Sequence, residues 1–190
     1  MNPEFVNQLA SALGTDRKEM VEKDVLLQQL LADLSADEFF SENFAFKGGT
    51  CLIKCYIGYY RFSEDIDFTW MDQARFGGLS QKAIRNLLSG EVAKVCALFG
   101  RICAKRGLDF KSKKGDRRYM EIGGSNKMLT LKLWYDSAVL KRESFIKVQI
   151  NFVETFCFGT KTVAARGIKV AEKKDGELSM LFPESRQGTS

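Results

Sequence analysis

Hydrophobic residues recur at helical spacing in the first part of the chain. Asn2–Glu4, with a proline at its centre, is a favourable helix start, and Gly14 is expected to end this helix. Thr15 or Asp16 can cap a second helix, in which apolar residues return every three or four positions up to Leu34. The pattern therefore predicts two consecutive N-terminal helices.

The elements become shorter after these helices. Phe44–Lys47 is typical of a short buried strand, Gly48 and Gly49 form a turn, and Thr50–Tyr56 returns to helical spacing. Asp65–Trp70 alternates polar and apolar residues, as a strand with one buried face does. We therefore expect a strand, a turn, a helix and a second strand in this order.

A long helical pattern and three strand patterns follow. Leu79–Arg106 is expected to be helical, with Ser80 as its cap and Gly90 as a point where it can break. Segments rich in β-formers, separated by glycine or polar residues, then occupy residues 117–124, 128–136 and 144–154. We interpret them as three sequential antiparallel strands.

The order of these elements predicts an α+β fold, a mixed β-sheet flanked by helices, with N-terminal helices and a long central helix. The length of 190 residues fits one domain. We place it at residues 1–182, with a helical N-terminal part at 1–40 and an α/β core at 43–158. Residues 183–190 are expected to form a disordered tail.

Composition removes several classes of function. Hydrophobic residues make up 45% of the chain, but no run of about 18 apolar residues occurs, so we expect no membrane span. The five cysteines include no CxxC pair, which favours a reducing, cytoplasmic location and argues against a zinc site. Histidine is absent, which excludes histidine-dependent nucleophilic catalysis. Catalysis would have to use carboxylates, lysine, arginine, hydroxyls and a hard metal ion.

The net charge of +5 is unevenly distributed. Arg101–Arg118 holds eight basic and two acidic residues, a local charge of +6. Such a segment can bind a polyanion, but a solvated lysine-rich loop would have the same composition. Both interpretations stay open at this point.

Asp65 and Asp67 are the first candidate functional residues. Side chains alternate along a strand, so the two carboxylates share one face while Ile66 and Phe68 point to the core. Two such carboxylates repel each other unless a cation lies between them, and Mg²⁺ or Mn²⁺ is the oxygen-bound ion expected there. A solvated strand edge is the alternative interpretation.

The Gly48–Thr50 turn supplies a complementary feature. A strand, a glycine turn and a helix start present free backbone N–H groups to an anion, and glycine lets the backbone approach a phosphate closely. Lys54 follows Thr50 by one helical turn, and Arg61 precedes the acidic strand, so both can add positive donors. Singly, the glycines can be an ordinary turn and Lys54 a surface side chain. Their combination with the aspartates predicts a nucleotide–metal site.

These segments resemble the nucleotidyltransferase AbiEii toxin family. That family carries a Lys-Gly-Gly-Thr/Ser segment, a lysine in the next helix and an Arg-Phe-Ser-Glu-Asp-Ile/Leu-Asp strand, similar to FKGGTCLIKCY and RFSEDIDF here. VEKDVLLQQLL at residues 21–31 and FIKVQINFVE at residues 145–154 are similar to the family's upstream helix and its later lysine-containing strand. The resemblance touches most of the chain up to residue 154.

The resemblance implies a fold of the DNA polymerase beta nucleotidyltransferase type and transfer of a nucleotide from an NTP with Mg²⁺ or Mn²⁺. It further implies a toxin of a toxin–antitoxin or abortive-infection system, with a cognate antitoxin protein as partner. The acceptor would be a hydroxyl of a tRNA acceptor end, of another RNA or of a protein. By position, nucleotide binding is assigned to Gly48, Gly49, Thr50, Lys54, Arg61 and Ser63. Metal binding is assigned to Asp65 and Asp67, and catalysis to these aspartates with Lys54, Lys147 and Gln149.

Two departures from the family pattern bear on activity. The family usually has an acidic residue at the position of Gln149, and a glutamine can bind a metal through its carbonyl oxygen but cannot act as a base. Glu121 and Glu154 are the candidates to replace that acid. The family's C-terminal helical segment, with a late Arg-Asp-x-x-Asp pattern, has no counterpart before Ser190, as expected of a short or truncated family member or of an incomplete copy.

Three functions are therefore weighed. We favour an active metal-dependent nucleotidyltransferase toxin over a degenerate relative that binds nucleotide or RNA without transfer. The third is a nucleic-acid-binding module that uses Arg101–Arg118. Phosphate-backbone binding weakens steeply with salt, whereas NTP binding at the aspartates would require Mg²⁺.

Overall fold

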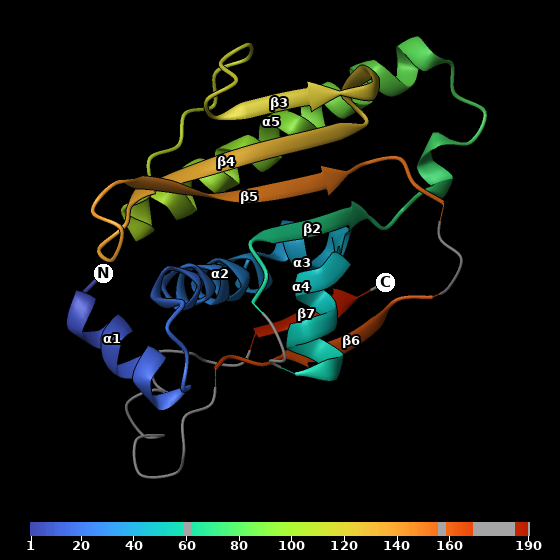
Figure 1. Cartoon of the computed structure of the whole chain (residues 1–190). Coiled ribbons are helices and arrows are strands. Elements are labelled where there is room, and N and C mark those ends of the chain that lie inside the picture. The colour runs from blue at the N-terminus through green and yellow to red at the C-terminus, as the bar shows by residue number, and fades with distance from the viewer. Residues whose placement is uncertain (59–61, 156–158, 169–184, 190) are drawn as a thin grey trace.

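The computed structural model of the chain describes residues 1–58, 62–155, 159–168 and 185–189 (Figure 1). The α-helices are α1 (Pro3–Ala12), α2 (Lys18–Ala36), α3 (Glu38–Asn43), α4 (Gly48–Cys51) and α5 (Gln81–Arg106). A π-helical turn, η1 (Leu52–Ile57), continues α4, and two 3₁₀ turns are η2 (Ala74–Phe76) and η3 (Gly124–Asn126). The strands are β1 (Phe44–Lys47), β2 (Asp65–Trp70), β3 (Met120–Gly123), β4 (Met128–Asp136), β5 (Glu143–Asn151), β6 (Lys161–Ala165) and β7 (Ser185–Thr189).

The described strands form one mixed sheet in the order β3-β4-β5-β2-β1-β7-β6. Strands β3, β4 and β5 form an antiparallel meander, which confirms that sequence prediction. Strand β5 then pairs in parallel with β2, and β2 pairs antiparallel with β1. Residues far apart in the sequence therefore become neighbours at the centre of the sheet.

Helices pack on one face of this sheet and form the main hydrophobic core. Alternate residues of β2, β4 and β5, among them Phe68, Leu131 and Val148, are fully buried against α2, α3 and α5. Figure 1 shows α5 behind β3 and β4. The residues between them, such as Asp67 and Gln149, are half-buried on the other face. The predicted α+β fold of the nucleotidyltransferase type is confirmed, and its polar sheet face is where the candidate site lies.

Helix starts agree with the sequence in two cases and differ in one. The Asn2 side chain accepts a hydrogen bond of 2.9 Å from the backbone N–H of Glu4, and Ser80 caps α5. The predicted cap of α2 at Thr15 or Asp16 is wrong, because Arg17 occupies that position without a side-chain cap. The Thr15 hydroxyl instead accepts from the N–H of Arg17 and closes the preceding turn.

Some elements were not predicted from the pattern. Helix α5 continues through Gly90 without a break, and α3 forms between α2 and β1. Strands β6 and β7 pair with each other, and β7 also pairs with β1. The tail predicted to be disordered at residues 183–190 thus includes strand β7 over Ser185–Thr189, because backbone pairing needs no hydrophobic pattern.

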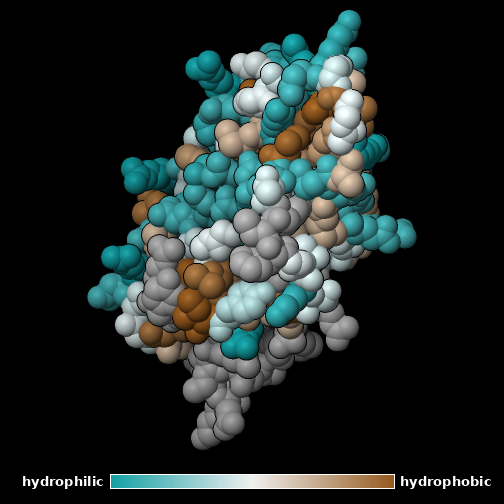
Figure 2. Space-filling model, turned by 90° about the vertical axis from the view of Figure 1, so that its right-hand side faces the viewer, coloured by the Kyte–Doolittle hydropathy of each residue, from teal (hydrophilic) through white to brown (hydrophobic). Residues whose placement is uncertain are grey.

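The surface is largely polar where it is described. Seen from the right-hand side of Figure 1, most of the coloured surface is hydrophilic, with separate hydrophobic areas between (Figure 2). Exposed large hydrophobic residues include Leu52 and Ile57 of η1. Within the described residues, no helix is both long and apolar enough to cross a membrane.

Candidate active site

Antiparallel pairing of β1 and β2 brings the glycine turn to the acidic strand. Lys47, the last residue of β1, lies opposite Asp67 in the register, so Gly48 begins α4 directly beside the Asp67 carboxylate. Gly48 has φ +77°, and a Cβ there would lie 3.0 Å from Cγ of Asp67 and closer still to a carboxylate oxygen. Only glycine fits this approach without strain. The turn and Asp67 therefore share one location.

Parallel pairing of β2 and β5 adds two more predicted residues to the same face. Asp65 lies opposite Lys147 and Asp67 lies opposite Gln149. The Lys147 ammonium is 2.6 Å from the Asp65 carboxylate, and both side chains keep about a third of their surface exposed, at 33% and 39%. The structure thus places Asp65, Asp67, Lys147 and Gln149 side by side on the solvent-accessible face.

The electrostatic environment of Asp67 is unfavourable for its charge. Burial raises the pKa of Asp67, the nearby Asp65 raises it further, and Lys47 and Lys147 act in the opposite direction. Asp65 and Asp67 therefore repel each other in the protein alone. A cation between them would relieve this repulsion, and two carboxylates with phosphate oxygens and waters are a donor set that Mg²⁺ accepts.

The described residues contain no cluster of three or more His, Cys, Asp or Glu side chains with the spacing of a metal site. If Asp65 and Asp67 hold a divalent ion, a nucleotide and water would have to complete its coordination. Their oxygen chemistry and shared face fit Mg²⁺ or Mn²⁺ bound in this way.

Thr50 and Ser63 fasten the two halves of the site together. Thr50 is buried, and its hydroxyl is 2.6 Å from that of Ser63 and also donates to the backbone carbonyl of Asp65. These hydrogen bonds tie the start of α4 to the start of β2. The structure therefore gives both hydroxyls a positioning contact beside Asp65, while Gly49 lies between Gly48 and Thr50 in α4.

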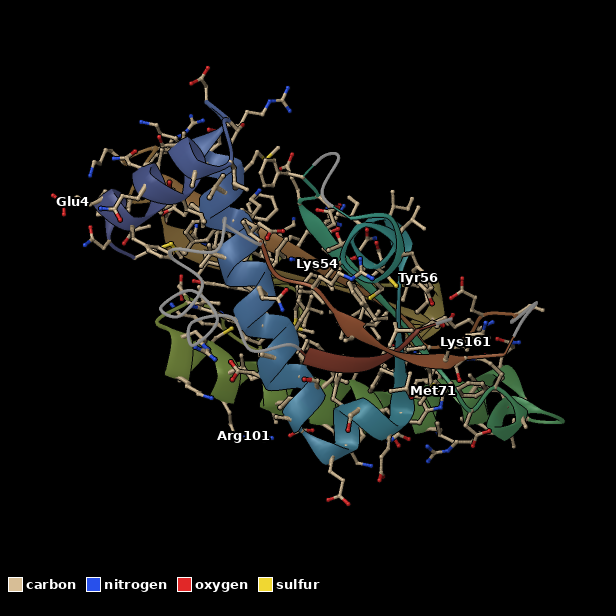
Figure 3. The ribbon with its side chains drawn as sticks, turned by 90° about the horizontal axis from the view of Figure 1, so that it is seen from below. Glu4, Lys54, Tyr56, Met71, Arg101 and Lys161 are labelled. Atoms are coloured by element: carbon tan, nitrogen blue, oxygen red, sulfur yellow. The ribbon has the colours of Figure 1, made fainter. Side chains whose placement is uncertain are left out.

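Lys54 does not lie at this face. Its side chain is fully buried, with the ammonium 3.0 Å from the Asp24 carboxylate and 3.1 Å from Oε1 of Gln28, both on α2. Figure 3 shows Lys54 on the side of η1 that faces α2. The expectation that Lys54 reaches a phosphate beside the aspartates is corrected accordingly. The i+4 spacing from Thr50 assumed an α-helix, whereas residues 52–57 form a π-helical turn.

Glu154 and Lys47 are site residues whose roles sequence reasoning missed or left open. The Lys47 ammonium pairs with the Glu154 carboxylate, and Gln73 accepts from the Glu154 N–H at 3.0 Å. Burial opposes ionisation of Glu154, but the hydrogen bond from Lys47 holds its pKa below the usual range. Glu154 also contributes to the raised pKa of Asp67. Its place at the end of FIKVQINFVE, after β5, was the available sequence signal.

Glu121, the other candidate for a third carboxylate, lies far from the aspartates. In the sheet register it is separated from Asp67 by Thr130 and Gln149, one on each intervening strand. At about 4.8 Å per strand this separation is about 14 Å. Glu121 instead pairs with Lys132 at 2.7 Å. Arg61, assigned to nucleotide binding, lies outside the described residues.

The mixed sheet, the glycine turn after β1 and the acidic pair on β2 define a domain of the nucleotidyltransferase type. Residues 29–169 match the family described as Nucleotidyl transferase AbiEii toxin, Type IV TA (toxin–antitoxin) system. The chain belongs to this family. The family consists of nucleotidyltransferase toxins, and its type IV system implies an antitoxin partner. Neither the curated proteins nor the solved structures gave a match.

Proposed function

We propose that the protein transfers a nucleotide from an NTP, with Mg²⁺ or Mn²⁺, to a hydroxyl of an RNA or a protein. The acceptor end of tRNA is the favoured RNA. The transfer makes the protein a toxin that its antitoxin controls. One observation carries this proposal: Asp65 and Asp67 share a solvent-accessible sheet face on which Gly48 leaves room for the Asp67 carboxylate.

The side chains on this face divide the work by their chemistry. Asp65 and Asp67 would hold the divalent ion, which neutralises charge that develops on the phosphates. Lys147, beside Asp65, would exchange its carboxylate partner for a phosphate oxygen. Gly48 and Gly49 would let the backbone approach the triphosphate. The protein's contribution is then positioning and electrostatic stabilisation of an in-line attack, with pyrophosphate as leaving group.

Activation of the attacking hydroxyl falls to a carboxylate other than Gln149. Gln149 lies directly opposite Asp67 on β5 but has no basic group. Glu154 is near enough to affect the pKa of Asp67 and is ionised through its contact with Lys47. We assign Glu154 this role, which requires it to leave Lys47 when the acceptor binds.

The proposal is tested by incubating the protein with each of the four α-³²P-labelled NTPs, Mg²⁺ and total tRNA. Label on RNA, or on a protein, is the expected result, and pyrophosphate should be released in equal amount. Asp65→Ala or Asp67→Ala should abolish labelling while the circular dichroism spectrum stays unchanged. Wild-type turnover in either variant would contradict the metal-binding role.

A degenerate, non-catalytic relative is the second candidate, and the glutamine opposite Asp67 is the observation that favours it. Such a protein would bind NTP or RNA without forming a labelled product. The wild-type assay separates the two candidates, because only an active enzyme forms a labelled product. In an active enzyme, Glu154→Gln should remove transfer and leave NTP affinity unchanged. Full transfer in this variant would remove Glu154 from the mechanism.

A further inference from the structure

A hollow lies beside the edge strand β3, apart from the aspartates. It has a volume of about 740 Å³ and lies between the start of α5, the loop before β3 and the turn η3. Three basic residues line it, Arg85, Lys114 and Arg117, together with Glu121 and Asn126. We call these residues and the hollow the β3 groove.

The positive charge of the β3 groove is not neutralised. Among the described residues, Arg85, Lys114 and Arg117 form no salt bridge, and all three side chains are exposed. The single acid in the lining, Glu121, is already paired with Lys132 at 2.7 Å. Three cations around one hollow, with Glu121 as the single acid in the lining, leave an excess of positive charge, and an anion there would reduce their mutual repulsion.

The basic segment Arg101–Arg118 divides into two parts on this basis. Lys105 and Arg106 pair with Asp33 of α2, and Arg118 pairs with Glu143. These side chains already have carboxylate partners within the protein. Lys114 and Arg117 are directed to the groove instead. The polyanion interpretation of the segment therefore applies to Lys114 and Arg117.

One wall of the groove is an unusual and fixed backbone turn. Gly124, Ser125 and Asn126 all have left-handed φ values, of 56°, 56° and 70°. For residues other than glycine this conformation is strained, and such strain persists where the surroundings enforce it. The Asn126 side chain enforces it by donating to the backbone carbonyl of Arg85 and to the Ser89 hydroxyl, at 3.2 and 3.1 Å. The turn therefore fixes the groove wall against α5 beside Arg85.

A polar row across the open face of the sheet leads from the aspartates to Glu121, which lies at the rim of the groove on the edge strand β3. Glu121, Thr130, Gln149 and Asp67 occupy successive strands in register. The row is about 14 Å long at about 4.8 Å per strand. A stacked single strand rises about 3.4 Å per nucleotide, so about four nucleotides cover this length.

We propose that the β3 groove binds backbone phosphates of a single-stranded nucleic acid about four nucleotides upstream of a terminal hydroxyl located at Asp65 and Asp67. The role of the groove as an acceptor subsite rests on the proposed nucleotidyltransferase function. The binding of the nucleic acid strand to the groove does not depend on that function. The groove is wide, open and basic, as suits a chain of phosphodiesters.

The test of binding uses a 5′-fluorescein-labelled 12-nucleotide single-stranded RNA without NTP. Fluorescence anisotropy measures its affinity for the protein at several salt concentrations. The variant Arg85→Gln/Lys114→Gln/Arg117→Gln should bind the RNA at least about tenfold more weakly than wild type. Its salt slope should be about two units shallower, since each phosphate contact on a single strand contributes about 0.7. A matched control, Arg17→Gln/Lys18→Gln/Arg142→Gln, removes three exposed basic residues elsewhere and should bind like wild type.

Two results would overturn the proposal. One is equal weakening in the groove variant and the control, which would mean that only net charge matters. The other is displacement of the RNA by inorganic triphosphate at equal phosphate concentration, which would make the groove a small-anion site. Urea unfolding of both variants ensures that neither result reflects misfolding.

A transfer assay then tests the acceptor role. The groove variant should have a raised KM for the 12-nucleotide acceptor and an unchanged KM for a dinucleotide, which is too short to reach the groove. An equal effect on both lengths would reject the subsite. If wild type transfers nothing to either acceptor but the binding results hold, the proposed function fails and the groove assignment stands.

Discussion

Two lysine–aspartate pairs in this protein have the same chemistry and opposite surroundings. Lys54 and Asp24 lie 3.0 Å apart with side chains 1% and 4% exposed. Lys147 and Asp65 lie 2.6 Å apart with side chains 33% and 39% exposed. The first pair joins η1 to α2 inside the protein, and the second lies on the open face of the sheet. The motif residues thus separate into one pair that holds the fold and one that is available to a ligand.

The difference teaches that burial decides what a charged motif residue can do. A buried ion pair cannot exchange partners without leaving a charge in a medium of low dielectric constant. A half-exposed pair exchanges its partner for water or phosphate at little cost. Lys147, which pairs across strands, is therefore a better candidate for phosphate contact than Lys54, which the motif spacing favoured.

Lys54→Ala should have the largest effect of all on stability. It removes the Lys54 cation from the buried Asp24 carboxylate, so the free energy of unfolding should fall by about 3–5 kcal/mol. Urea denaturation measures this. The double variant Asp24→Leu/Lys54→Met should recover much of the loss, because it removes both charges. A stable Lys54→Ala protein with weakened NTP binding would instead return Lys54 to the nucleotide site.

Gly48→Ala should have an intermediate effect and should abolish transfer. The left-handed φ of this residue costs about 1–2 kcal/mol for alanine, and the new Cβ would displace the Asp67 carboxylate. Gly14→Ala is the matched control, because Gly14 has φ +63° with nothing within 4 Å of the added atom. Gly14→Ala should lower the free energy of unfolding by a similar amount and keep full transfer. Equal activity in both variants would contradict the close approach of the turn to Asp67.

Lys147→Gln should change stability by less than about 1 kcal/mol, because a half-exposed ion pair is screened by solvent. Transfer should fall at least about tenfold, since a positive group aimed at developing charge is lost. The control is Lys105→Gln on α5, which breaks a 2.7 Å contact to Asp33 on the opposite side of the sheet. It should leave transfer unchanged, and a drop equal to that of Lys147→Gln would mean that the effect is not local.

Asp67→Asn should have the smallest effect on stability, and its sign depends on pH. Burial and Asp65 raise the pKa of Asp67, so the folded state binds more protons than the unfolded state between the ordinary aspartate pKa and the raised one. The contribution of Asp67 to stability therefore decreases as pH rises through this window. Without metal, the asparagine variant should become the more stable protein at neutral pH. Urea denaturation from pH 3 to 8 compares the two proteins, and wild type gaining on the variant as pH rises would contradict this sign.

Local patterns were sufficient to predict much of the fold. The Asn2 and Ser80 caps, the strands at Asp65 and after, and the meander of β3, β4 and β5 all follow from neighbouring residues. The shared face of Asp65 and Asp67 follows from strand alternation alone. For these features, sequence and structure agree because no distant contact is needed to form them.

The parts that the sequence did not predict depend on contacts between distant residues. Lys54 is buried because Asp24, 30 positions earlier, lies opposite it, and a π-helical turn replaces the expected α-helix. Lys47 meets Glu154 across 107 positions. Strands β6 and β7 form by backbone pairing, which leaves little trace in side-chain pattern. No local periodicity contains these contacts.

The most direct test of the site measures Mn²⁺ binding to the protein by electron paramagnetic resonance, with and without a non-hydrolysable NTP analogue. Wild type should bind the ion only when the analogue is present, and Asp65→Asn/Asp67→Asn should lose that binding. The control Asp16→Asn/Asp136→Asn, which removes two exposed carboxylates elsewhere, should behave as wild type. Undiminished, analogue-dependent Mn²⁺ binding in the Asp65→Asn/Asp67→Asn protein would contradict the assignment of the metal to this face of the sheet.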